Sequence, residues 1–90
     1  MLTGMHITYN IPNKSTLTQR QYFTYNLSIV VMGTEYEDDT LHIVLNVGYE
    51  PGVYDNRSAM CEEVMRVMDE ILSSEYGVEC RGVINDTYDI

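Results

Sequence analysis

Hydrophobic and polar residues alternate in three stretches of the chain. The first covers residues 5–11, the second runs from Phe23 to Gly33, and the third covers residues 41–49. A period of two is typical of β-strands that bury one face. A short polar segment joins the second and third stretches, so we expect a hairpin with residues 34–40 at its tip.

The period changes after the third stretch. Apolar side chains recur at helical spacing from about Ala59 to Tyr76, which predicts one amphipathic helix. Gly77 suits the left-handed conformation that often ends a helix. Asp55 or Ser58 is expected to cap the helix N-terminus, because either side-chain oxygen accepts a hydrogen bond from a free amide of the first turn.

A fourth strand is expected over residues 78–84, with Val78, Cys80 and Ile84 facing the core. The order β-β-β-α-β predicts a single α+β domain over residues 1–90, with one helix packed on one face of a mainly antiparallel sheet. The other face would carry apolar side chains, namely Tyr22, Val30, Met32 and Val44. Because one helix cannot cover both faces, we expect a homodimer or another partner at the uncovered face.

The net charge of the chain restricts the classes of function that we expect. The 90 residues contain 14 acidic and five basic side chains, for a net charge of -9, and no acidic residue precedes Glu35. DNA, RNA and anionic membranes repel such a chain, so we expect it to bind neither nucleic acid nor membrane. It contains no run of 18 apolar residues and no signal-peptide pattern, so a cytoplasmic location is expected.

Few residues suggest catalysis. The chain has no phosphate-binding loop, no nucleophile motif and no zinc-ligand spacing, so we expect neither an enzyme nor a bound cofactor. Cys61 and Cys80 are expected to be buried thiols. His6 and His42 lie on the polar sides of their strands and are candidate neighbours across the sheet. With Glu35 or Glu50 they offer metal ligands in principle, but an ordinary structural or solvent-facing role is favoured.

The acidic residues form two candidate partner-binding groups. One is the hairpin tip, where Tyr36 is a candidate for stacking on an arginine of the partner. The other is the outer helix face, where acidic pairs repeat after seven residues, or roughly 10.5 Å. The alternative to a partner-binding surface is an acidic surface that is only solvated, with Arg66 stabilising the helix through i,i+4 pairs. The candidate residues are Glu35, Tyr36, Glu37, Asp38, Asp39, Glu62, Glu63, Asp69 and Glu70.

Two resemblances follow from these features. In size, charge and tyrosine-rich composition the chain resembles small phage-encoded inhibitors, including anti-CRISPR proteins and DNA mimics. That resemblance implies a non-enzymatic inhibitor that occupies the basic nucleic-acid-binding groove of a host defence or nucleic-acid-processing protein. Residues 27–72 are also similar to the core of phage tail-terminator proteins, with Gly-Val-Tyr-Asp at 52–55 before the helix. This second resemblance implies a virion subunit that assembles into an oligomeric ring.

Overall fold

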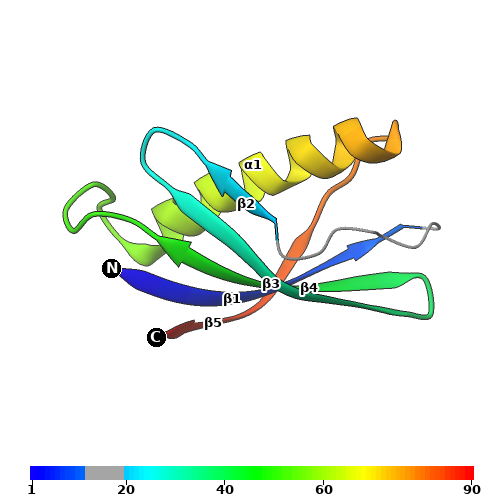
Figure 1. Ribbon diagram of the computed structural model, residues 1–90, viewed down its shortest axis with the longest axis horizontal. Helices are drawn as coiled ribbons and strands as arrows, with labels where there is room; N and C mark the ends of the chain where they lie inside the picture. Colours follow the sequence, from blue (N-terminus) through cyan, green and yellow to red (C-terminus); the bar gives the residue numbers. More distant parts are fainter. Residues whose placement is uncertain (12–19) are drawn as a thin grey trace.

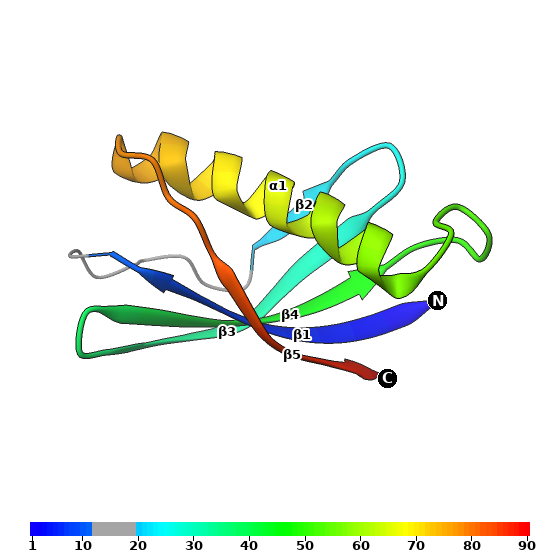
Figure 2. The same cartoon turned by 180° about the vertical axis from the view of Figure 1, so that it is seen from behind.

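The computed structural model describes residues 1–11 and 20–90, which form one five-stranded sheet and one helix (Figures 1 and 2). All neighbouring strands are antiparallel, and their order in the sheet is β2-β3-β4-β1-β5. The helix lies on one face, so the expected α+β architecture is confirmed. The elements are β1 (Leu2–Asn10), β2 (Gln21–Phe23), β3 (Ser28–Glu37), β4 (Thr40–Gly48), α1 (Arg57–Tyr76) and β5 (Val83–Asp89).

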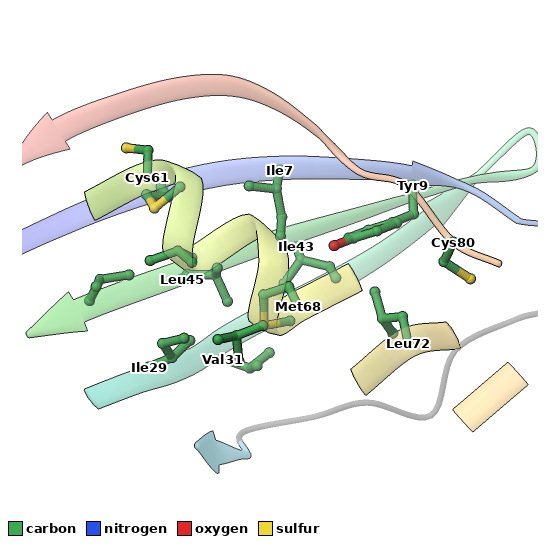
Figure 3. Packing of buried hydrophobic residues seen from close by; sticks show 14 of the residues in the cluster. Ile7, Tyr9, Ile29, Val31, Ile43, Leu45, Cys61, Met68, Leu72 and Cys80 are labelled. Atoms are coloured by element: carbon green, nitrogen blue, oxygen red, sulfur yellow. The ribbon is translucent and has the colours of Figure 1, made fainter. Parts of the chain in front are cut away.

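The core lies between α1 and the central strands (Figure 3). Strand alternation turns every second residue of β1 and β4 toward the helix, and the register pairs Met5 with Leu45 and Ile7 with Ile43. All four of these side chains have no exposed surface. The helix contributes its apolar stripe to the same layer, where the buried residues are Met60, Cys61, Val64, Val67, Met68 and Leu72.

The second alternating stretch is divided between two strands. Phe23 ends β2, and a turn then leads into β3, with the Thr24 amide donating to the Leu27 carbonyl at 2.9 Å. The Thr24 hydroxyl accepts from the Leu27 amide at 3.1 Å and closes the turn. Phe23 is 71% exposed and Tyr25 is fully exposed, so the expectation of one strand with both side chains on its buried face was wrong.

Gly33 does not end β3, as the sequence suggested. A β-bulge between Val31 and Gly33 inserts Met32 opposite β4, and the strand continues to Glu37. The turn therefore contains only Asp38 and Asp39. Both have positive φ, 49° and 62°, as a tight type I′ hairpin turn requires.

The helix begins at Arg57, before the expected start at about Ala59. Asn56 is the N-cap, and its side chain accepts from the Ala59 amide at 2.9 Å, in place of Asp55 or Ser58. At the other end Gly77 has a φ of 70° and its amide donates to the Ser73 carbonyl at 2.9 Å, which confirms the predicted left-handed C-cap.

The last strand forms later than expected, over Val83–Asp89. Residues 78–82 instead return along the helix, where the Cys80 amide donates to the Ser73 hydroxyl at 2.8 Å. Cys80 is buried as predicted, but Val78 and Ile84 are exposed. A short alternating run does not distinguish a strand from a segment held by helix side chains, which explains the error.

Asp69 connects the two layers. Its Oδ1 accepts from the Tyr9 hydroxyl at 2.7 Å and from the Gly82 amide at 3.0 Å, so one carboxylate joins α1, β1 and the segment before β5. Gly82 is required for this approach, because a Cβ there would lie 2.5 Å from the Tyr9 ring.

We expect Asp69→Ala to lower the free energy of unfolding by about 2–3 kcal/mol, because it leaves the hydroxyl of buried Tyr9 and the partly buried Gly82 amide without this acceptor. The neighbouring substitution Glu70→Ala is the control. It removes only an exposed pair with Arg66 and should cost about 0.5 kcal/mol or less. Urea denaturation of both variants measures the difference, and equal losses would contradict the role given to Asp69.

Candidate functional site

Four carboxylates gather at the end of the β3–β4 hairpin. Strand alternation directs Glu35 and Glu37 out of the sheet face that the helix leaves open, where they pair in register with His42 and Thr40. Asp38 and Asp39 form the turn itself. All four side chains are exposed, and we call this group the acidic hairpin end.

Tyr36 does not belong to this surface. The bulge at Met32 shifts the alternation of β3, so Tyr36 lies on the helix side of the sheet and packs against the core. Its hydroxyl donates to the Ile11 carbonyl and thereby ties β3 to the chain that leaves β1. The structure therefore places Tyr36 in a packing role, contrary to the expectation that it stacks on a partner.

The acidic residues of the helix are largely engaged within the chain. Glu63 accepts from the Tyr54 hydroxyl at 2.7 Å, and Glu70 pairs with Arg66 at 3.2 Å. Asp69 is committed to Tyr9 and Gly82, as described above. Of the four helix candidates, Glu62 alone has no ion pair or side-chain hydrogen bond to another described residue.

The helix face and the hairpin end are not one surface. The helix lies on one face of the sheet (Figures 1 and 2). Strand alternation directs Glu35 and Glu37 out of the opposite face. The two acidic groups expected from the sequence thus lie on different sides of the molecule. A flat partner cannot contact both at once.

The arginines compensate charge away from the hairpin end. Each arginine in the described part of the chain forms an ion pair, and none of these pairs involves the acidic hairpin end. The pairs are Arg20–Glu75, Arg57–Asp89, Arg66–Glu63, Arg66–Glu70 and Arg81–Glu79. Among the described residues, no ion pair therefore neutralises Glu35, Glu37, Asp38 or Asp39.

A shallow hollow of about 380 Å³ lies beside this end, on the open face of the sheet. His6 and His42 meet there, with Nε2 of His6 3.2 Å from Nδ1 of His42 and ring centroids 5.4 Å apart. The prediction that they are neighbours is confirmed. Glu35, Glu37 and Val44 line the same hollow, and Gly33 at the bulge leaves it open because it has no side chain.

The rest of the open face is partly apolar. Val30, Met32 and Val44 lie on it, as expected, and Met32 is 49% exposed. Tyr88 of β5 lies over Gly4, where a Cβ would be 2.3 Å from the tyrosine ring. Tyr22 is the exception, because it pairs with Ile29 and packs on the helix side of the sheet.

The cysteines lie apart from the acidic hairpin end and from the hollow. Cys61 and Cys80 are free and buried, at opposite ends of the core in Figure 3. Burial raises the pKa of the Cys61 thiol, which disfavours the reactive thiolate. Across residues 1–11 and 20–90, no group of three or more His, Cys, Asp or Glu side chains is placed to hold a metal ion.

Comparisons with protein-family models, curated proteins and solved structures returned no match. Within the described residues, no helix is both long enough and apolar enough to cross a membrane. The phage-inhibitor and tail-terminator resemblances therefore continue to rest on the sequence features that suggested them.

Alkaline pH should destabilise the fold through two tyrosines. Burial, followed by the hydrogen bond to Glu63, raises the pKa of Tyr54 to about 12, and burial beside Asp69 raises the pKa of Tyr9. Both folded-state pKa values lie above the ordinary value of 10.0, so this stabilisation is complete below pH 10. The Tyr54 contribution is lost as pH rises through about 12, and the Tyr9 contribution continues to fall at higher pH.

Urea denaturation at a series of alkaline pH values, with tyrosinate absorbance followed in parallel, tests this expectation. Tyr54→Phe should flatten part of the pH dependence, whereas Tyr25→Phe, at a fully exposed position, should not change it. An unaltered profile for Tyr54→Phe would contradict the assignment.

Substitutions in the β3–β4 turn can remove negative charge and raise the stability of the protein at the same time. Asn-Gly is the preferred type I′ sequence, so Asp38→Asn with Asp39→Gly should raise the free energy of unfolding by about 1 kcal/mol. That corresponds to a melting temperature about 4–8 °C higher. Asp38→Asn with Asp39→Ala removes the same charges but keeps a Cβ at positive φ, so it should be less stable than the glycine variant. The reverse order in thermal unfolding would contradict the turn geometry.

Proposed function

We propose that this protein is a non-enzymatic, acidic binding protein that acts in the cytoplasm of a host cell. In this proposal the acidic hairpin end enters a basic groove of a nucleic-acid-binding protein, such as a defence or nucleic-acid-processing factor, and competes with its nucleic acid. Lysines and arginines that bind phosphates also bind carboxylates, through charge-assisted hydrogen bonds. The proposal matches the anti-CRISPR and DNA-mimic resemblance of the composition.

The observation that carries the proposal is the distribution of ion pairs. The described arginines compensate acidic residues of the helix, of the segment after it and of β5, and leave Glu35, Glu37, Asp38 and Asp39 uncompensated. Glu35 and Glu37 lie on β3, paired with β4, and Asp38 and Asp39 form the two-residue turn that joins these strands, so the positions of all four carboxylates are held by the sheet. A preordered group of charges binds at a lower entropic cost than a flexible acidic tail.

A second candidate is the tail-terminator-like subunit of an oligomeric ring. The open sheet face favours it, because Met32, Val44 and Tyr88 are exposed there. In the sheet that the described residues form, β5 is an edge strand, and an edge strand offers unpaired backbone groups to another subunit. This candidate predicts a higher oligomer in solution, whereas the inhibitor predicts a monomer or a dimer.

A pull-down from a bacterial lysate, with the captured protein identified by mass, tests the proposal. The bait pair is the Asp38→Asn/Asp39→Gly variant and a matched control, Glu62→Gln/Glu70→Gln. Each variant removes two negative charges, but the control removes them from the outer helix face. Both should remain folded by circular dichroism.

We expect the turn variant to bind the captured protein at least tenfold more weakly than the wild type, and the helix variant to bind within about threefold. Added salt should weaken the wild-type complex, and DNA should compete with it. Equal affinity of wild type and turn variant would contradict the proposal. Light scattering that gives a hexamer or a larger ring would favour the second candidate.

A further inference from the structure

We propose that His6 and His42 form a two-imidazole binding site for a late first-row divalent cation, such as Zn²⁺, on the open face of the sheet. This inference is independent of the proposed function, because it rests on the hollow beside the hairpin and not on the turn. It assigns a role to two side chains that neither packing nor the acidic hairpin end requires.

The sheet register brings the two imidazoles together. His6 pairs with Val44 and His42 pairs with Thr8, so the histidines occupy diagonal positions on neighbouring strands and share one face. Their ring planes are inclined by 32°, and the facing nitrogens are 3.2 Å apart. Two Zn–N bonds of tetrahedral geometry separate their nitrogens by roughly 3.3 Å. The observed spacing therefore suits one shared metal ion without a movement of the strands.

The two facing nitrogens are 3.2 Å apart, a distance at which the N–H of one neutral imidazole donates to the lone pair of the other. A metal ion that takes both nitrogens as ligands replaces this shared proton. Imidazole favours zinc, nickel and copper over magnesium and calcium, which sets the class of the ion.

The surroundings favour positive charge and leave room for further ligands. Glu35 and Glu37 line the hollow, and Asp86 lies across from His6 in the register of β1 and β5. Among the residues that the structure describes, no lysine or arginine lines the hollow. Because the described chain places two ligands and not a set of three, water or the Glu35 carboxylate would complete the coordination. We therefore expect weaker binding than at a four-ligand structural zinc site.

Calorimetric titration of the full chain at neutral pH, with zinc chloride alone and with calcium chloride alone, tests the site. Wild type should bind one zinc ion, and His6→Gln and His42→Gln should each weaken binding at least tenfold. The Asp38→Asn/Asp39→Gly variant is the matched control for bulk negative charge and should bind zinc within about threefold of wild type. Urea denaturation confirms that each variant is folded.

Three calorimetric results would overturn the inference. The first is the absence of zinc binding to wild type at millimolar concentration. The second is equal zinc affinity in wild type and the histidine variants, and the third is calcium binding as tight as zinc, because either would show attraction to acidic groups only. Electron paramagnetic resonance of the Cu²⁺ complex provides a readout that needs no variant. It should show hyperfine coupling from two nitrogens, and a spectrum from oxygen ligands alone would contradict the site.

Discussion

One helix covers one face of a five-stranded sheet, and this constraint determines the rest of the molecule. The apolar stripe of α1 packs on the side chains that β1, β3 and β4 direct toward it, and these residues form a continuous buried cluster. Burial of apolar side chains therefore stabilises only the sheet face that the helix covers. The second face must remain partly polar, which explains why His6, His42 and Glu35 occupy its positions.

Polar contacts then fix how the helix sits on the sheet. The Asp69 carboxylate receives hydrogen bonds from Tyr9 and from the Gly82 backbone, so an acidic residue from the middle of the helix secures the chain on its way to β5. Glu63 has a comparable contact with Tyr54 near the other end of the helix. Acidic residues that look like surface charge in the sequence therefore contribute to stability, and the uncompensated charge is confined to fewer positions than the composition suggests.

The sequence predicted where strands and the helix occur better than it predicted which side chains of a strand face the core. Alternation in residues 5–11 and 41–49 and the helical spacing before Gly77 were sufficient to predict β1, β4 and α1, because each has one buried face. The bulge at Met32 was not predictable, since an inserted residue changes which side chains face the core without altering the local composition. Tyr36 was consequently expected in the hairpin tip and not in β3.

The candidate site was predictable in part for the same reason. The acidic hairpin end follows directly from four acidic residues beside a turn, whereas the engagement of Glu63, Asp69 and Glu70 depends on tertiary partners far away in the chain. The approach of His6 and His42 was expected from their strand faces. The distance between the two imidazoles could not be predicted, because it depends on the register of strands whose histidines are 36 positions apart in the chain.

The central claim is that the charge available to a partner lies at the hairpin end and not on the helix. Hydrogen–deuterium exchange of the protein, free and bound to the partner captured from lysate, tests this claim most directly. The account predicts slower exchange on binding in residues 35–40 and unchanged exchange along Arg57–Tyr76. Protection confined to the helix or to β5, with no change at the hairpin end, would contradict it.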